Sequence, residues 1–216
     1  ELPNYNEGHW WVQDYSVMLP IYMLNKIKNK KIIDMCAAPG GKLFQILSQG
    51  NEVDAYEINK ERAEILIENL NRLKFKRNVK ITDSMNVKEK NNYDIVLVDS
   101  PCTSVGTIRR NPEIFFRTSS INIDYYTAKQ SSLLEHASKL VKNRGIIIYM
   151  VCSFLRKETN QQINKFLRRN RKFSVIPYKK DGVGHGLISK KGFLKILPSS
   201  HEKNFLIDGF FAVQLR

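Results

Sequence analysis

The sequence contains few cysteines and no spacing that would pair them. Its 216 residues include only Cys36, Cys102 and Cys152, and none of these belongs to a Cys-x-x-Cys pair. Disulfide-rich scaffolds and zinc ribbons need closely spaced cysteines, so both classes are excluded. The four histidines are dispersed without the spacing of metal ligands. We therefore expect no metal, a reducing cytoplasmic setting and thiols that are free to react.

Long apolar runs and targeting signals are missing as well. No run approaches the roughly 20 apolar residues of a membrane span, and the first residues do not resemble a signal peptide. We therefore expect no membrane partner. With 42% hydrophobic residues, a chain of this length can bury one full core. We expect a single domain over residues 1–216, with residues 1–30 as a lead-in.

Acidic residues are scarce relative to basic ones. Lys and Arg total 35 against 21 Asp and Glu, which gives a formal net charge of +14 and a pI near 9.7. This excess points to a polyanionic partner, and it favours RNA or DNA over a membrane. The alternative is compositional drift, because many Lys, Asn and Ile residues are also typical of an AT-rich genome. In the lead-in, Trp10, Trp11 and Tyr15 are expected to pack, with RNA stacking as the other possibility.

Short apolar runs alternate with amphipathic stretches along the chain. The apolar runs predict strands at 31–36, 52–56, 78–82, 95–98, 146–151 and 173–176. The alternating pattern of 209–215 predicts a last edge strand. The amphipathic stretches predict helices at 16–29, 43–49, 60–73, 124–140 and 157–170. Loops are expected at 103–123 and 179–191, and a turn at 144–145. This alternation predicts an α/β fold with a doubly wound, mostly parallel sheet.

The stretch 93–113, YDIVLVDSPCTSVGTIRRNPE, joins a buried strand to reactive side chains. Its apolar run ends at Asp99, and Pro101 cannot continue a paired central strand. A carboxylate and the Cys102 thiol thus follow the carboxyl end of a strand, the edge where open α/β sheets bind ligands. Cys152 follows another predicted strand in the same way. Taken alone, the segment is also compatible with a turn around a buried cysteine.

A glycine-rich loop follows the first predicted strand and opens a helix. It reads CAAPGGK from Cys36 to Lys42, and strand, glycine loop and helix in this order form a nucleotide-type binding turn. The loop is not G-x-G-x-x-G, and Leu43 excludes the G-K-[ST] ending of a triphosphate loop, which disfavours a nucleotide-dependent dehydrogenase. Glu57 ends the second predicted strand, where an acid commonly holds ribose hydroxyls, although a solvated charge is the alternative.

Three motifs together, DMCAAPGGK, DSPCTSVGTIRRNPE and YMVCS, resemble those of the Nop/Sun family of RNA cytosine-5 methyltransferases. The resemblance runs from residue 12 to residue 216 and is strongest to the catalytic half of the bacterial 16S ribosomal RNA enzymes of the Sun or Fmu type. It implies a Rossmann-like class I methyltransferase fold, with helices on both faces of the sheet and a final antiparallel strand. It also implies S-adenosylmethionine as the cofactor and 16S ribosomal RNA as the substrate, with transfer RNA as the alternative.

The resemblance assigns the cofactor site to one loop and three carboxylates. The loop residues are Cys36, Ala37, Ala38, Pro39, Gly40, Gly41 and Lys42. Glu57 matches the family's ribose-binding acid, Asp83 the acid beside the adenine, and Asp99 the acid near the methionine moiety and the target base. Cys36 is also small enough to be only a packing residue of this loop.

The resemblance further assigns the catalytic and RNA-binding residues. Cys152 matches the nucleophile, Cys102 the cysteine that assists product release, and the pair Arg109 and Arg110 an RNA-binding segment. A thiolate that adds to carbon 6 of cytosine makes carbon 5 electron-rich, which is covalent catalysis. A free cysteine titrates near about 8.5, so we expect the basic helix from about Lys157 to lower the pKa of Cys152 and to offer a second RNA-binding surface.

Several features depart from the family pattern. Val151 stands where Thr is usual, Ser100 where Ala is frequent, and Thr159 separates a usual Glu-Asn pair. The upstream RNA-binding segment of the family is not in this sequence, so we expect weak RNA binding by a monomer. A cofactor-binding RNA-binding protein without catalysis is one alternative. A DNA cytosine-5 methyltransferase, which would use Cys102 as nucleophile and need a large recognition domain, is another.

Overall fold

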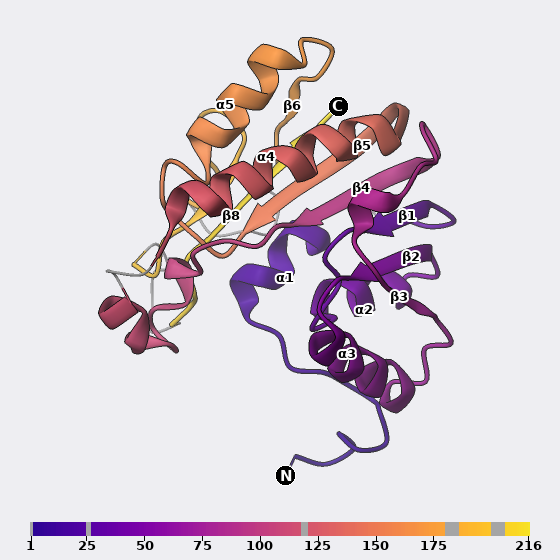
Figure 1. Cartoon of the computed structure of the whole chain (residues 1–216). Helices are drawn as coiled ribbons and strands as arrows, with labels where there is room; N and C mark the ends of the chain where they lie inside the picture. The colour runs from indigo at the N-terminus through magenta and orange to yellow at the C-terminus, as the bar shows by residue number, and fades with distance from the viewer. Residues whose placement is uncertain (1, 25–26, 118–120, 180–185, 200–205) are drawn as a thin grey trace.

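The computed structural model describes residues 2–24, 27–117, 121–179, 186–199 and 206–216. The strands are β1 (Lys31–Asp34), β2 (Glu52–Glu57), β3 (Val79–Ile81), β4 (Tyr93–Asp99), β5 (Val141–Val151), β6 (Val175–Ile176), β7 (Leu194–Ile196) and β8 (Phe210–Leu215). They form one eight-stranded sheet in the order β3-β2-β1-β4-β5-β8-β6, with β7 also paired to β8 (Figure 1). Strands β1 to β5 run parallel, whereas β8 is antiparallel to β5, β6 and β7. The predicted mostly parallel sheet with a final antiparallel strand is confirmed.

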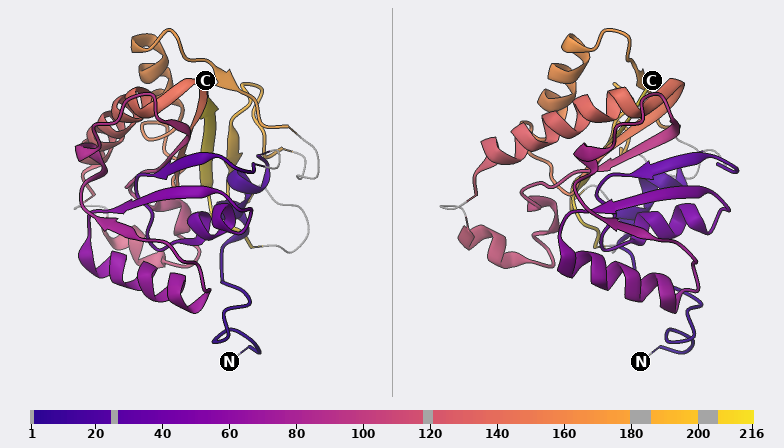
Figure 2. Two further views of the ribbon diagram at one scale, coloured as in Figure 1. Left: turned by 90° about the vertical axis from the view of Figure 1, so that its right-hand side faces the viewer. Right: turned by 45° about the vertical axis from the view of Figure 1, so that its right-hand side comes forward.

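Helices cover both faces of this sheet, as predicted (Figures 1 and 2). The helices are α1 (Tyr15–Tyr22), α2 (Gly41–Leu47), α3 (Lys60–Arg72), α4 (Ile123–Leu140) and α5 (Asn160–Arg169), with 3-10 turns η1 (Ser84–Asn86), η2 (Val105–Thr107) and η3 (Pro112–Arg117). One apolar cluster joins α1, α2 and α3 to the sheet, and another joins α4 and α5 to the opposite face.

The central strands have the two-sided burial that their apolar runs predict. In β1, Ile32 belongs to the cluster under α1 to α3, and Ile33 belongs to the cluster under α4 and α5. In β4, Leu97 belongs to the cluster under α1 to α3, and Val98 belongs to the cluster under α4 and α5. Successive side chains of a strand point to opposite faces, so a continuous apolar run is what a sheet covered on both sides requires.

The prediction that residues 209–215 form an edge strand is wrong. Strand β8 lies inside the sheet, between β5 on one side and β6 and β7 on the other, and all six of its residues are buried. The short pairing partner β7 was not predicted, because three residues carry too little periodic signal. An apolar run reports burial but does not report how many neighbours a strand has.

Several other boundaries differ from the sequence-based expectation. The helix predicted over 16–29 ends at Tyr22, and residues 25–26 lie outside the described residues, as do 180–185 of the predicted loop. The expected turn at 144–145 lies inside β5, as an irregularity with a left-handed Arg144. A Cβ at Gly145 would lie 2.9 Å from the Asp94 carbonyl oxygen, so glycine is needed for this close approach. The helix predicted from 157 begins at Asn160.

The parallel strands bring the polar strand ends to one edge of the sheet. β1 ends at Asp34, β2 at Glu57 and β4 at Asp99, and Cys152 directly follows β5. Ser100 N–H continues the β4–β5 ladder by donating to the Met150 carbonyl at 3.0 Å. This edge therefore carries most of the residues that the motifs predict to be functional.

Within the described residues, no helix combines the length and the apolar character that crossing a bilayer requires. In the same part of the chain, no group of three or more His, Cys, Asp or Glu side chains is arranged to hold a metal ion.

We predict that Phe211 of β8 is a major contributor to stability. Its ring is buried and packs edge-on against Tyr149 and Phe193, with ring centroids 6.5 and 5.5 Å away. Phe211→Ala should lower the free energy of unfolding by about 3–5 kcal/mol, measured by urea denaturation. The matched control is Phe116→Ala, because Phe116 is 87% exposed and should change the value by less than about 0.5 kcal/mol. Equal effects of the two substitutions would contradict the described position of β8.

Candidate active site

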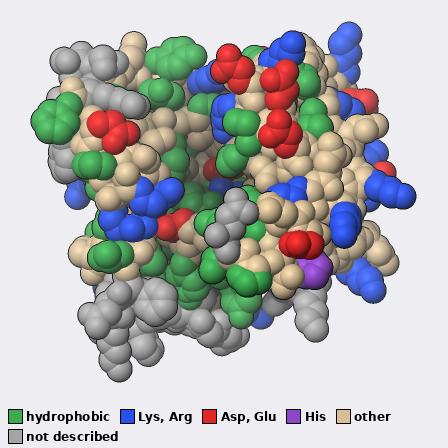
Figure 3. All heavy atoms as spheres, turned by 90° about the horizontal axis from the view of Figure 1, so that it is seen from below, with side chains coloured by type: hydrophobic (Ala, Val, Ile, Leu, Met, Phe, Trp, Pro, Cys, Tyr) green, Lys and Arg blue, Asp and Glu red, His purple; other side chains and the backbone are tan. Residues whose placement is uncertain are grey.

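A cavity of about 610 Å³ opens at the carboxyl edge of the sheet. The strand-end residues Asp34, Asp99, Cys102 and Cys152 line it, and so do all seven residues of the glycine-rich loop that were predicted to bind the cofactor. Seen from below, this side of the molecule is hollowed, with hydrophobic side chains around the hollow (Figure 3). The structure therefore brings the predicted loop and both predicted thiols to one cavity.

The glycine-rich loop owes its shape to residues without side chains. Gly40 has a left-handed φ of 114° and precedes α2 directly. A Cβ at this position would lie 2.2 Å from the Phe44 ring, so another residue would clash as well as strain the backbone. The loop is thereby held close to α2, and both of its glycines line the cavity.

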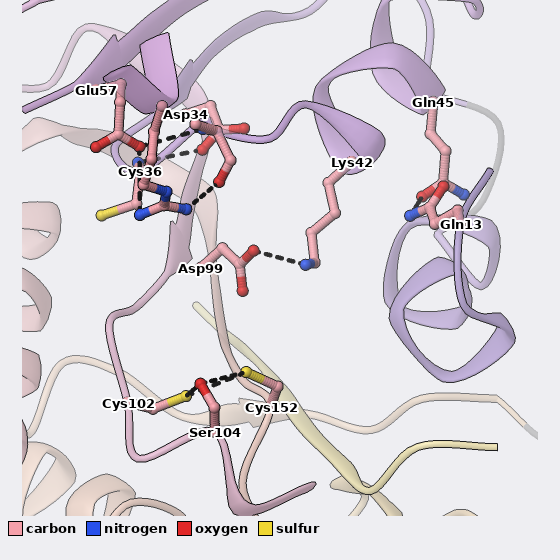
Figure 4. Close-up of polar contacts among 12 residues, drawn as sticks. Gln13, Asp34, Cys36, Lys42, Gln45, Glu57, Asp99, Cys102, Ser104 and Cys152 are labelled. Carbon is pink, nitrogen blue, oxygen red and sulfur yellow. Dashed lines mark hydrogen bonds and ion pairs between the residues drawn. The ribbon is translucent and has the colours of Figure 1, made fainter. Parts of the chain in front are cut away.

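The lead-in segment forms another wall of this cavity. Trp11, Gln13 and Asp14 line it, and the Trp11 ring packs edge-on against Phe44 with centroids 5.8 Å apart. Gln13 donates to the Gln45 side chain at 2.9 Å, which attaches the segment to α2 (Figure 4). The packing interpretation of Trp11 is thus supported, and its place in the cavity wall was not foreseen.

The cavity is lined by the buried side chains of Asp34 and Lys42 and by the partly buried Asp99. The Lys42 ammonium lies 2.6 Å from the Asp99 carboxylate, and the two thiols lie below this pair in the view of Figure 4. Asp34 accepts a hydrogen bond from the Cys36 N–H at 3.3 Å. Burial, with repulsion from Asp99, raises the pKa of Asp34 to about 7. Asp34 was missed as a site residue, because the first strand was predicted to run to residue 36, whereas it ends at Asp34.

The two strand-end thiols are in contact. Cys102 Sγ lies 3.3 Å from Cys152 Sγ, and Cys152 Sγ lies 3.4 Å from the Ser104 hydroxyl (Figure 4). The hydrogen bond with Cys102 lowers the pKa of Cys152, as does the one with Ser104, against the opposing effect of burial. The pKa of Cys102 is raised by the same hydrogen bond and by burial. Cys152 is therefore the better thiolate of the two.

This arrangement corrects the predicted cause of the reactivity of Cys152. A basic helix starting near Lys157 was expected to lower its pKa, but α5 begins at Asn160, and Lys157 pairs with Asp124 at 3.0 Å. The groups that lower the pKa of Cys152 are Cys102, Ser104 and the more distant Lys42. Ser104 could not be singled out from the sequence, because a serine in a loop carries no signal of its partner.

Two glycines set the approach of the thiol-bearing loops. Gly106 N–H donates to the Cys152 carbonyl at 3.0 Å, and Gly209 N–H donates to the Gly106 carbonyl at 2.7 Å. A Cβ at Gly106 would lie 2.0 Å from the Gly209 oxygen. The loop after β4, the loop after β5 and the start of β8 can therefore meet only where these positions lack side chains.

Two predicted cofactor carboxylates lie outside the cavity lining. Glu57 is buried beside the loop, where it accepts from Ala38 N–H at 3.3 Å and Asn59 N–H at 3.0 Å and lies 3.7 Å from Arg62. Asp83 caps η1 by accepting from Met85 N–H. Glu57 thus contacts the loop and Arg62, and Arg62 itself lines the cavity. Asp83 does not line the cavity.

The predicted RNA-binding arginines are paired with carboxylates. Arg110 donates to the buried Asp208 at 2.7 Å, and Arg109 lies 3.3 Å from Asp208 and 3.5 Å from Asp14. Asp208 directly precedes Gly209, so these ion pairs add to the links between the loop after Cys102 and the start of β8. The Arg110 side chain is still half exposed and lines the cavity.

We predict that Asp34 destabilises the cofactor-free protein above neutral pH. Its pKa is about 7 in the folded state against an ordinary 3.8, so folding favours the protonated form and stability falls as pH rises between these values. Asp34→Asn should have little effect near pH 4 and should raise the free energy of unfolding at pH 8 by up to about 4 kcal/mol in urea titrations.

Asp94→Asn is the matched control with the opposite sign. Despite partial burial, hydrogen bonds from Lys31 N–H and Lys142 hold the pKa of Asp94 below its ordinary value. Asp94→Asn should therefore lower the free energy of unfolding at neutral pH, and this decrease should become smaller as pH falls. A pH-independent effect of Asp34→Asn would contradict the raised pKa.

Comparison with known proteins supplies the identity that the site suggests. A family model described as "16S rRNA methyltransferase RsmB/F" matches residues 21–216. The ribosomal RNA small subunit methyltransferase B of Photorhabdus laumondii subsp. laumondii is 36% identical over 174 residues, which are 78% of this chain and 41% of the relative. That of Citrobacter koseri is 32% identical over 219 residues, 99% of this chain and 48% of the relative. The chain thus spans less than half the length of either relative.

Solved structures agree with the fold. A methyltransferase homolog protein from Pyrococcus horikoshii matches with a TM-score of 0.77 and 26% identity, over 100% of this chain and 70% of that one. NSun6 from Pyrococcus horikoshii, solved with SFG, has a TM-score of 0.84 over 100% and 55% of the two chains, and at 24% identity it supports the fold alone. The Rossmann-like class I methyltransferase fold is confirmed, and the chain belongs to the RsmB/F family of 16S rRNA methyltransferases.

Proposed function

We propose that this chain transfers a methyl group from S-adenosylmethionine to carbon 5 of a cytosine in 16S ribosomal RNA, through a covalent adduct with Cys152. The observation that carries the proposal is the pair of thiols 3.3 Å apart, in one cavity with Asp99. One thiol suffices for a packing role, whereas two in contact suit a reaction in which a thiolate adds and later leaves. Membership of the family supports an RNA substrate, and the net charge of +14 suits a polyanion.

The proposed reaction explains why a thiolate is required. Carbon 5 of cytosine is a poor nucleophile until the sulfur of Cys152 bonds to carbon 6 and the displaced electron pair enriches carbon 5. The bound cofactor supplies an electrophilic methyl group. Loss of the carbon 5 proton to a base then returns an electron pair to the ring, which breaks the bond from carbon 6 to sulfur and releases the Cys152 thiolate.

The two thiols divide this work according to their surroundings. Cys152 has the lowered pKa and is the proposed nucleophile. Cys102 has the raised pKa, so it keeps its proton and can donate a hydrogen bond to the sulfur that must leave, which suits product release. Asp99 pairs with Lys42 in the same cavity as the thiols (Figure 4), and we propose that its carboxyl group contacts the N3–N4 edge of the base.

The cavity suits a cationic cofactor. Asp34 and Asp99 bring two carboxylates close enough to repel each other, and a sulfonium or ammonium group would relieve this repulsion. We propose that the loop Cys36–Lys42 holds the cofactor, with Glu57 at its ribose, Asp83 beside its adenine and Asp99 near its methionine part. If so, Arg62 must release Glu57, which it now contacts.

The remaining proposals concern the RNA-binding surface, the oligomeric state and the cellular compartment. We propose that Arg109 and Arg110 contact RNA phosphates beside the cavity, because Arg110 is half exposed there. The basic residues around α5 provide a second candidate surface. Residues 1–216 would act as one catalytic domain, as a monomer and in the cytoplasm.

The proposed roles of the thiols predict different failures for two variants. Cys152→Ala should give neither adduct nor product, because carbon 5 is never activated. Cys102→Ala should still form the adduct but should stay joined to the RNA. Denaturing gels with RNA and cofactor would show this as a slow-moving band, and digestion of the RNA would show 5-methylcytosine.

A band with Cys152→Ala and none with Cys102→Ala would reverse the roles. A wild type that binds RNA and cofactor without product would favour the non-catalytic alternative, and preference for transfer RNA would correct the substrate.

The proposed cofactor site predicts a loss of affinity at Glu57. Glu57→Ala should weaken S-adenosylmethionine binding by about 1.5–3 kcal/mol in isothermal titration, the scale of a charge-assisted hydrogen bond. Glu52→Ala is the matched control, because Glu52 lies exposed at the other end of β2. Unchanged affinity of a folded Glu57→Ala variant would refute the assignment.

A further inference from the structure

One buried carboxyl group connects the two thiol-bearing loops. Glu158 is fully buried, and its side chain accepts four hydrogen bonds. One oxygen accepts from Thr103 N–H at 2.9 Å and from the Gln130 amide at 3.0 Å. The other accepts from the Thr103 hydroxyl at 2.6 Å and the Ser153 hydroxyl at 2.5 Å. A buried carboxyl group needs such donors to offset its lost hydration.

Two of the three donor residues directly follow a cysteine in the chain. Thr103 follows Cys102 and Ser153 follows Cys152. The Glu158 carboxyl group therefore binds the residue after each cysteine. Gln130 of α4 also donates to the Pro101 carbonyl at 3.0 Å, on the other side of Cys102. Glu158 itself is fixed through its carbonyl, which accepts from the Tyr149 hydroxyl at 2.8 Å. The carboxyl group thus has the contacts needed to set where each sulfur lies.

We propose that Glu158 is a positioning residue that holds the sulfurs of Cys102 and Cys152 in contact. The effect of Glu158 on methyl transfer rests on the proposed function. The claim that Glu158 holds the two sulfurs in contact does not. The residue lies outside the cavity lining and is not expected to touch the RNA or the cofactor. It acts through Thr103 and Ser153, so its removal should separate the sulfurs while leaving both cysteines present.

Separation of the sulfurs should also change the acidity of Cys152. The groups that face this thiol are Cys102 and Ser104 from the loop after β4, Asp99 at the end of β4, Lys42 from α2, and Arg110. Cys102 makes the largest contribution to the lowered pKa. Loss of that contact should therefore raise the pKa of Cys152, although the other groups remain.

Phenylarsine oxide, a trivalent arsenical that bridges two neighbouring thiols, provides a direct measure of the contact. A Cys36→Ala background leaves only Cys102 and Cys152 to bind it. In this background, Glu158→Ala and Ser153→Ala should each weaken arsenical binding by about tenfold or more, whereas Gln162→Ala should change it by less than about twofold. Gln162 is the matched control, because it is buried on α5 and donates only to the Thr127 carbonyl, away from the thiols, among the described contacts.

A second readout follows the acidity of Cys152. The rate of its alkylation by iodoacetamide, measured by mass spectrometry of the Cys152 peptide across pH, should have a higher midpoint in Glu158→Ala than in the background. A general loss of packing, as probed by Gln162→Ala, should not move this midpoint.

The outcomes separate this proposal from the proposed function. Arsenical binding at the background level by a folded Glu158→Ala variant would overturn it, and Ser153→Ala decides in the same way if Glu158→Ala does not fold. An equal loss in Gln162→Ala, or no binding by the background, would overturn it too. Methyl transfer is assayed separately, so a chain without methyltransferase activity that shows the expected arsenical series would refute the function and leave the positioning role intact.

Discussion

The parallel pairing of β4 with β5 is the constraint on which the site depends. Its register places Asp99 opposite Met150, and Ser100 N–H extends the ladder by one more bond to the Met150 carbonyl. Cys102 and Cys152 follow within a few residues, on loops that leave the same edge of the sheet. The two cysteines are 50 positions apart in the chain, yet their sulfurs lie 3.3 Å from each other. The strand register thus brings the two thiol-bearing loops together without a covalent link.

The charges around this edge include one that is unfavourable to the folded state. Asp34 and Asp99 are held near each other although their repulsion raises the pKa of Asp34, and only part of the cost is offset by the 2.6 Å ion pair of Asp99 with Lys42. Unfavourable buried charge of this kind is typical of sites that are completed by a ligand. The loops around the thiols are stabilised instead, by Glu158 on one side and by Asp208 with its two arginines on the other.

The parts that the sequence could predict are those with a local signal. Apolar runs such as 95–98 locate the buried strands, and the residues that end these runs locate the site, because all parallel strands end at one edge. The motifs around Cys36, Cys102 and Cys152 then indicate the family. The interior position of β8 could not be predicted in this way, because burial on both faces is the same for an edge strand that is covered and a strand with two neighbours.

The parts that the sequence could not predict involve partners far apart in the chain. Glu158 and Thr103 are separated by 55 residues, and Arg110 and Asp208 by 98, so no local pattern joins them. The predicted cause of the reactivity of Cys152 was wrong for the same reason. A run of basic residues near Lys157 is visible in the sequence, whereas the approach of Cys102 and Ser104 to the second thiol exists only once β4 and β5 are paired.

The central claim is that Cys152 bonds to carbon 6 of a cytosine, and an RNA that contains 5-fluorocytidine tests it most directly. Fluorine at carbon 5 cannot leave as a proton does, so an adduct formed in the presence of S-adenosylmethionine should persist through digestion. We predict that mass spectrometry will find the nucleotide on the peptide that contains Cys152. The nucleotide on the Cys102 peptide, or the absence of any adduct from a protein that binds both cofactor and RNA, would contradict the account.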